Sequence, residues 1–268
     1  STVFMAPEIR QLTDALLTGF GQFVDTLHGD YITAEDVGMT VSAMQTVANE
    51  TAYVAGLPSD EGQAGGDPSP KTADGVFHGI RAAVRHETGS DSLEGLHVAV
   101  QGVGNVGLSL CRTLANAGAR LTVADINEAR VRMVCDELSA TPSSLEDIVA
   151  TDADVFSPCA LGAILNESSI PTLKARIVAG AANNQLATDE DGKRLFDAGV
   201  IYAPDYVINA GGIINVACEY EGGVSDADVD QRVAHIGARL DTIFEQSARD
   251  KRPTNEIADQ LARERIGR

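Results

Sequence analysis

Apolar residues recur with helical spacing through the N-terminal third of the chain. Between residues 9 and 27 they fall on one helix face, at Ile9, Leu12, Leu16, Phe20, Phe23, Val24 and Leu27. The same spacing predicts a second helix from about Thr33 to Thr51. A stretch rich in Gly and Pro at 62–70 then predicts a loop and a domain boundary, and a further helix is expected from Thr72 to His86.

The middle of the chain alternates short β-rich runs with segments long enough for helices. The runs lie at His97–Gln101, Leu121–Ala124, Asp154–Phe156, Arg176–Ala179 and Val200–Ala203. This alternation predicts a parallel sheet with right-handed crossovers. After Ala203 the pattern is helical again, with Gly211-Gly212 near one helix start and a charged helix at 227–249. We therefore expect an α/β fold with helices at both ends of the chain.

A glycine motif follows the first of the expected strands. Residues Gly102, Val103, Gly104, Asn105, Val106 and Gly107 form the spacing GxGxxG. Alone this spacing is a weak signal, but here it leaves a strand, opens a helix and precedes a second strand. The first glycine would allow a tight turn, the second the approach of a pyrophosphate, and the third close packing of helix and strand. The phosphates would lie at the helix N-terminus.

An acidic residue ends the second strand. Asp125 lies 18 residues beyond Gly107, where a carboxylate accepts hydrogen bonds from the ribose hydroxyls of a dinucleotide. Its charge would repel the 2′-phosphate of NADP, and no Arg follows immediately, so the expected cofactor is NAD. The next residue, Ile126, is also expected to bind the cofactor. Two alternatives are a glycine-rich turn without a ligand and a methyltransferase-like nucleoside site. Three glycines suit a pyrophosphate better, and we expect a Rossmann-like, doubly wound, mostly parallel sheet.

Composition limits the partners. Lys and Arg total 20 against 39 Asp and Glu, for a formal net charge of -19. Nucleic acid is disfavoured because phosphate binding requires a basic face, and an anionic membrane surface is disfavoured for the same reason. No run of 18 apolar residues and no signal-peptide pattern is present. The cysteines lie far apart in the sequence, and we expect them to be reduced and buried in a cytoplasmic protein. The four cysteines and five histidines show no metal-binding spacing, so no metal is expected.

Taken together, the motifs resemble the amino-acid dehydrogenases of the glutamate/leucine/phenylalanine/valine family, particularly its leucine and valine branch. The matching segments keep the family's order along nearly the whole chain, at 31–38, 66–73, 90–95, 100–107, 157–162, 184–186 and 202–212. The resemblance implies reversible, NAD-dependent oxidative deamination of a branched-chain or aromatic L-amino acid to the 2-oxo acid and ammonia. It also implies a homo-oligomer with a small amino acid or 2-oxo acid as its substrate.

The same resemblance assigns residues. Asp36 matches the family's catalytic aspartate. Ala34 and Gly38 flank Asp36 and are expected to shape the substrate pocket, to which Asn209 is also assigned. Thr72, Asn184 and Asn209 match positions at the nicotinamide end of the cofactor, and Cys159 and Ala160 match a loop that passes its ribose. Without the resemblance, Asp36 fits a helix cap through the Thr33-x-x-Asp36 spacing, Asn209 a turn, and Cys159 a packed small residue.

One departure concerns lysine. The family's chemistry depends on two lysines, the second in a GGGK-like segment, whereas the first lysine here is Lys71. Two hypotheses follow: the sequence is a fragment of a longer enzyme, which is favoured, or it is a shortened, NAD-binding, non-catalytic chain. A dehydrogenase for hydroxy acids is disfavoured because no His occupies a catalytic setting. We expect a remnant of the substrate domain at 1–70, an NAD-binding domain at 71–204, and C-terminal helices at 205–268 that pack on the substrate domain.

Overall fold

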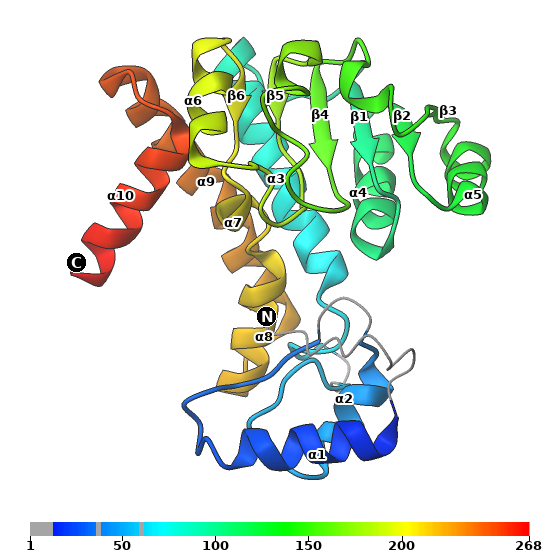
Figure 1. Ribbon diagram of the computed structural model, residues 1–268, viewed down its shortest axis with the longest axis vertical. Helices are drawn as coiled ribbons and strands as arrows, with labels where there is room; N and C mark the ends of the chain where they lie inside the picture. The colour runs from blue at the N-terminus through cyan, green and yellow to red at the C-terminus, as the bar shows by residue number, and fades with distance from the viewer. Residues whose placement is uncertain (1–12, 36–38, 59–61, 268) are drawn as a thin grey trace. The chain divides into compact units, whose positions relative to one another are not determined.

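The computed structural model describes residues 13–35, 39–58 and 62–267 of the 268-residue chain. The chain forms two compact units (Figure 1). The first comprises Ser1–Pro68 with Gly212–Gln231, and the second comprises Ser69–Gly211 with Arg232–Arg268. Residues beyond 204 thus divide between both units. The division expected from the sequence, at 1–70, 71–204 and 205–268, remains a prediction.

The first unit is helical. It contains α1 (Asp14–Asp25), α2 (Val41–Ala48) and nearly all of α8 (Gly211–Glu221). Threonines cap the first two helices: the Thr13 hydroxyl accepts from the N–H of Leu16, and the Thr40 hydroxyl accepts from the N–H of Ala43. Helices α1 and α2 pack together around a small apolar core of Leu17, Met44, Val47 and Val54.

Helix α2 begins later than the apolar spacing predicts. A start near Thr33 is wrong, because the backbone of Thr33 pairs with the segment at 53–55 instead. The Thr33 N–H donates to the carbonyl of Tyr53 at 3.0 Å, and the Thr33 carbonyl accepts from the N–H of Ala55 at 2.8 Å. The helix starts at Val41, where Thr40 supplies the cap. The spacing Thr33-x-x-Asp36 therefore does not mark a helix start.

The second unit is built on a six-stranded parallel sheet in the order β3-β2-β1-β4-β5-β6, seen side by side in Figure 1. The strands are β1 (His97–Gln101), β2 (Arg120–Ala124), β3 (Thr141–Pro142), β4 (Val155–Pro158), β5 (Ile177–Val178) and β6 (Ile201–Tyr202). The prediction of a Rossmann-like, doubly wound sheet is confirmed, together with five of its strands. Strand β3, a two-residue edge strand that contains a proline, was not predicted.

Helices cover both faces of this sheet. The helices of this unit are α3 (Ser69–Thr88), α4 (Asn105–Asn116), α5 (Glu128–Leu138), α6 (Asp189–Asp197), α7 (Asp205–Ile208), most of α9 (Asp226–Asp250) and α10 (Thr254–Ile266), with short turns η1 (Ile148–Ala150) and η2 (Ile170–Thr172). Helices α4 and α5 lie against β1 and β2, and α6 and α10 lie against β6. An ion pair between Arg85 and Asp241, at 2.5 Å, joins α3 to α9.

The core of the sheet is apolar on both faces. Ala99, Phe156, Val178 and Tyr202 are paired across four neighbouring strands and pack with Ile148, Ile170 and Leu195 from η1, η2 and α6. Their strand neighbours Val98, Val100 and Val155 point to the opposite face and are also fully buried. Burial on both faces is typical of parallel strands and explains their nearly continuous apolar runs.

Among residues 13–35, 39–58 and 62–267, no helix is both long enough and apolar enough to cross a membrane. The four cysteines, at positions 111, 135, 159 and 218, are free thiols. Within the same described ranges, no group of three or more His, Cys, Asp or Glu side chains could hold a metal ion.

Candidate functional site

The loops that follow the strands meet at one edge of the sheet. In a parallel sheet all carboxyl ends lie on the same side, and ligands bind there at the point where the strand order reverses. In this order the reversal falls between β1 and β4. The loops after β1 and β4 carry the glycine motif and Cys159-Ala160, so two of the predicted cofactor segments adjoin the reversal point.

The glycine loop is held in place by close backbone contacts. Gly102 has φ +92°, in the left-handed region that favours glycine, and a Cβ there would lie 2.9 Å from the backbone N of Ala160. A Cβ on Gly107 would lie 1.9 Å from the carbonyl oxygen of Gly102. Helix α4 therefore packs directly on the turn that leaves β1, as the glycine spacing predicts.

The start of α4 offers donors to an anion. Gly104 is its N-cap residue and supplies no side-chain cap, so the first N–H groups of the helix have no partner within it. Among the described residues other than its two chain neighbours, the only atom within 4 Å of a Cβ built on Gly104 is the Nη1 of Arg130, at 3.7 Å. The second glycine thus faces open space at a helix N-terminus. This arrangement fits a pyrophosphate, which needs both backbone access and N–H donors.

Asp125 is bound to the glycine loop. Its Oδ2 accepts from the N–H of Val103 at 2.7 Å, and its Oδ1 accepts from the N–H of Asn127 at 2.8 Å. A carboxylate has about four acceptor positions, so two remain for ribose hydroxyls. The side chain is half-buried, and Ile126 beside it is 88% exposed, an apolar surface of the kind that an adenine ring covers.

Arg130 is the residue at this edge that the sequence reasoning missed. It lies in the first turn of α5, whose N-cap Asn127 accepts from the N–H groups of Ala129 and Arg130. Its guanidinium reaches back to Gly104, because side chains on a helix lean toward its N-terminus. An Arg three residues after an Asn cap was the available signal, but sequence spacing alone does not bring it to the glycine loop.

The loop after β4 is packed rather than reactive. The Cys159 N–H donates to the carbonyl of Gln101 at 2.7 Å, and the Cys159 Sγ lies 3.6 Å from the Ser157 hydroxyl. Burial raises the pKa of the Cys159 thiol, although hydrogen bonds with the Ala181 backbone and Ser157 oppose that rise. A thiol that stays protonated is a poor nucleophile. Cys159 and Ala160 therefore contribute shape and backbone groups to this edge.

Amides gather after β5 and β6. The Asn209 Nδ2 donates to the Oδ1 of Asn183 at 2.6 Å and to the carbonyl of Ala181 at 3.2 Å. Asn184 has φ +52°, and its carbonyl accepts from the N–H of Ala163 at 2.7 Å, so this loop lies beside the one after β4. The side-chain partner of the Asn209 amide is Asn183, which was not among the predicted site residues.

Thr72 lies close to the segment that carries Asn209. A Cβ built on Gly211, two residues after Asn209, would lie 1.9 Å from the carbonyl oxygen of Lys71 and 3.1 Å from the Cα of Thr72. The first turns of α3 therefore contact the chain directly after Asn209. This brings together the positions that the resemblance assigns to the nicotinamide end.

The predicted substrate residues belong to the first unit. Ala34 is half-buried, whereas Asp36 and Gly38 lie outside the described residues. Glu35, which sequence reasoning did not select, has a buried Oε2 with no hydrogen-bond partner among the described residues. Burial, and secondly the charge of Asp67, hold the pKa of Glu35 above its ordinary value. Glu35 and Asp67 thus lie close enough in this unit for their charges to interact.

Comparison with known proteins gives consistent results. A family model described as glutamate/leucine/phenylalanine/valine dehydrogenase matches residues 122–266. The chain is 45% identical to a leucine dehydrogenase of Geobacillus stearothermophilus over 265 residues, which are 99% of this chain and 72% of the relative. It is 42% identical to a valine dehydrogenase of Streptomyces virginiae over 260 residues, 95% of this chain and 71% of that one.

Solved structures agree. The crystal structure of L-tryptophan dehydrogenase from Nostoc punctiforme matches with a TM-score of 0.81 and 42% identity, covering 97% of this chain and 74% of that one. A glutamate dehydrogenase from Thermus thermophilus, 20% identical, matches with a TM-score of 0.77 and covers 94% of this chain and 67% of that one, which shows a shared fold.

Proposed function

Because the chain belongs to the glutamate/leucine/phenylalanine/valine dehydrogenase family and is an L-amino-acid dehydrogenase, we propose that it uses NAD to deaminate a branched-chain or aromatic L-amino acid reversibly. The products are the 2-oxo acid, ammonia and NADH. The observation that carries the proposal is the hydrogen bond between Asp125 and Val103, which joins an acid suited to a ribose to a glycine loop suited to a pyrophosphate.

In this proposal, residues of the chain itself would bind each part of the cofactor. The N–H groups at the start of α4 would bind the pyrophosphate, and Asp125 and Ile126 would bind the adenosine. The loop at Cys159 and Ala160 would lie beside the second ribose. Thr72, Asn184 and Asn209 would orient the nicotinamide. When bound, NAD accepts a hydride. The negative charge of Asp125 would disfavour the 2′-phosphate of NADP, which supports NAD as the cofactor.

Asp36 would carry the protons. As a base it takes a proton from the substrate ammonium group, so that the nitrogen lone pair helps expel hydride from Cα and leaves an imine. As an acid and base in turn it assists the addition of water to the imine carbon, and ammonia leaves as the 2-oxo acid forms. A carboxylate suits this role when its surroundings bring its pKa toward neutrality.

We infer the substrate class from the relatives in the family. The leucine, valine and tryptophan dehydrogenases named among them act on amino acids with apolar side chains. We infer the same class here and expect oxidation of leucine, valine or an aromatic amino acid. The division into an NAD-binding domain at 71–204 and a substrate domain at 1–70 is part of the proposal.

The test is a steady-state assay of the protein, with NADH absorbance as the signal. Leucine, valine, phenylalanine and tryptophan are offered with NAD or NADP, and the matching 2-oxo acids with NADH and ammonia. We expect turnover with NAD and one of these amino acids. The variant Asp36→Asn should bind NADH normally but lose nearly all turnover.

The outcomes separate the parts of the proposal. Unchanged turnover in Asp36→Asn would remove Asp36 from the mechanism. If the protein binds NADH but oxidises none of the amino acids and reduces none of the 2-oxo acids, the chain is a cofactor-binding protein without this activity. Turnover with 2-hydroxy acids instead would identify a different dehydrogenase.

A further inference from the structure

We propose that Arg130 binds the pyrophosphate of the dinucleotide and closes the glycine loop over it from the side of α5. The proposal rests on the NAD site described above and adds a residue that the glycine motif does not contain. The observation behind it is the distance of 3.7 Å between the Arg130 Nη1 and the Cβ position of Gly104. Gly104 is the glycine whose missing side chain admits the pyrophosphate.

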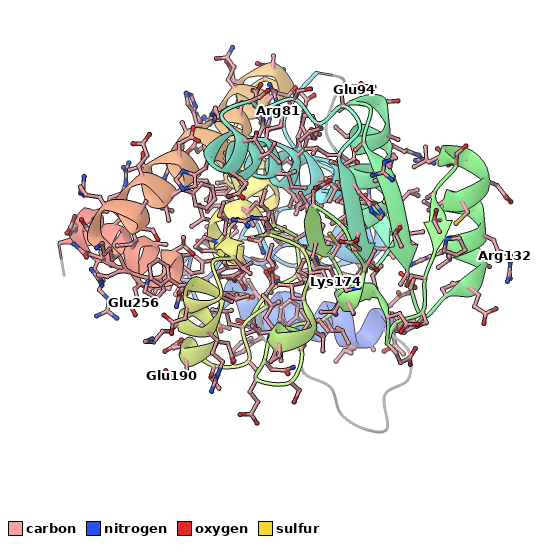
Figure 2. The ribbon with its side chains drawn as sticks, turned by 90° about the horizontal axis from the view of Figure 1, so that it is seen from above. Arg81, Glu94, Arg132, Lys174, Glu190 and Glu256 are labelled. Atoms are coloured by element: carbon pink, nitrogen blue, oxygen red, sulfur yellow. The ribbon has the colours of Figure 1, made fainter. Side chains whose placement is uncertain are left out.

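The two arginines of α5 have different surroundings. The Arg132 Nη1 lies 3.3 Å from the Glu128 carboxylate, four residues earlier, and the side chain is 68% exposed. Figure 2 shows Arg132 pointing away from the sheet at the outer side of α5. Among the described residues, no carboxylate forms an ion pair with Arg130, and its guanidinium is turned toward the glycine loop. Arg130 is therefore a cation that is available to an anion at this loop.

The acidic surroundings of the glycine loop make a nearby cation favourable for binding a diphosphate. The segment from Asp125 to Glu128 carries two acids, and the whole chain carries a formal charge of -19, so a diphosphate would otherwise meet a repulsive surface. A guanidinium beside the loop offsets this repulsion and donates charge-assisted hydrogen bonds. The N–H groups of α4 would hold the diphosphate from one side and Arg130 from the other.

The position favours the pyrophosphate over a 2′-phosphate. Asp125 marks the ribose, and its two oxygens are held by the N–H groups of Val103 and Asn127. A 2′-phosphate would lie beside that carboxylate. The Arg130 guanidinium instead lies at Gly104, on the phosphate side of the loop.

Binding measurements on the whole protein test the assignment. The variant Arg130→Gln removes the charge and keeps a polar side chain, Arg130→Lys keeps a point charge, and Arg132→Gln removes one charge from the same helix as a matched control. Dissociation constants are measured for NADH by fluorescence titration, and for ADP-ribose, adenosine and NADPH by displacement of NADH. All variants are compared by circular dichroism for correct folding.

We expect Arg130→Gln to weaken NADH and ADP-ribose about tenfold, as the loss of one charge-assisted contact implies, and to change adenosine by less than about twofold. Arg130→Lys should fall between wild type and Arg130→Gln, and Arg132→Gln should match wild type. The difference between wild type and Arg130→Gln should shrink in high salt, because exposed charges are screened beyond ~3 Å at 1 M ionic strength.

Several results would overturn the assignment. Equal effects of Arg130→Gln and Arg132→Gln would show only a general charge effect. An equal loss for adenosine and ADP-ribose would place Arg130 on the adenine, and a larger loss for NADPH than for NADH would place it on the 2′-phosphate. If wild type binds no NADH at all, the proposed function fails, whereas NADH binding that Arg130→Gln leaves unchanged contradicts this inference alone.

Discussion

From the close contact between Gly107 and Gly102 we predict how much Gly107→Ala lowers stability and NADH affinity. A Cβ added at Gly107 lies 1.9 Å from the Gly102 carbonyl oxygen and 2.9 Å from its carbon. Real Cβ contacts are essentially never shorter than 3.0 Å, so Gly107→Ala must separate α4 from the turn by about 1.1 Å. Both sides of the contact are backbone, and no side-chain rotation can relieve it.

The cost follows from that displacement. Overpacking in a protein interior costs about 1–3 kcal/mol, and a clash between two backbone segments belongs at the upper end of this range. We expect Gly107→Ala to lower the free energy of unfolding of the second unit by about 3 kcal/mol. The N–H groups at the start of α4 would move by a similar distance, and a misplacement of about 1 Å can cost roughly a hundredfold in function. NADH affinity should fall by about that factor.

Gly104→Ala is the matched control on the same loop. Its Cβ meets no described atom closer than 3.7 Å, and φ of -68° is open to alanine, so the fold should be kept and even gain about 0.4–1 kcal/mol. The methyl group would nevertheless occupy the space through which a pyrophosphate approaches, so NADH affinity should still fall by about tenfold or more.

Urea unfolding followed by circular dichroism and NADH fluorescence titration measure both quantities on the same samples. We expect Gly107→Ala to lose both stability and NADH binding, and Gly104→Ala to lose NADH binding alone. Wild-type stability in Gly107→Ala would refute the close contact between α4 and the turn. Wild-type NADH affinity in Gly104→Ala would refute the placement of the pyrophosphate.

Two further predictions concern the first unit. The folded state raises the pKa of Glu35, so the stabilisation from its bound proton is complete below the ordinary pKa and is lost as pH rises through the raised value. Glu35→Gln should therefore unfold at a higher urea concentration than wild type at about pH 8 and at an equal one near about pH 4, and an equal gain at both values would contradict this. Glu219 accepts from the N–H groups of Gly56 at 2.8 Å and Leu57 at 2.9 Å. Glu219→Ala should destabilise the unit by about 2 kcal/mol and speed hydrogen exchange at those two amides. Unchanged exchange would show that the Glu219 carboxylate does not hold them.

The strand, the glycine turn and the helix of the first βαβ unit could be predicted because their signals are local. The glycine spacing, the strand before it and the acid after the next strand lie within about thirty residues of a single βαβ unit. Strand β1 was predicted at its observed bounds, and Gly102 and Gly107 make the contacts that the spacing implies. In such a unit the connections are short, so residues that are near in sequence are also near in space.

The residues that escaped prediction depend on contacts between distant segments. Thr33 carries a good capping pattern, but its backbone pairs with Tyr53 and Ala55, and that pairing overrides the local preference. In the sequence, Arg130 has the pattern of an ordinary helix residue. Only the packing of α5 brings its guanidinium close to Gly104. The partner of Asn209 is Asn183, 26 residues away, which no spacing rule connects.

The order of the polar groups along the carboxyl edge of the sheet indicates which residues would affect cofactor affinity and which would affect turnover. Chain order runs from the glycine loop through Asp125 to the amides, whereas the sheet order places the loop after β2 first, then those after β1, β4, β5 and β6. Asp125 and the amide group of Asn183 and Asn209 thus fall on opposite sides of the glycine loop. A dinucleotide is itself linear, with adenosine at one end and the reacting ring at the other. We infer that substitutions from Gly102 to Arg130 change cofactor affinity, whereas substitutions at the amide group change turnover at saturating cofactor.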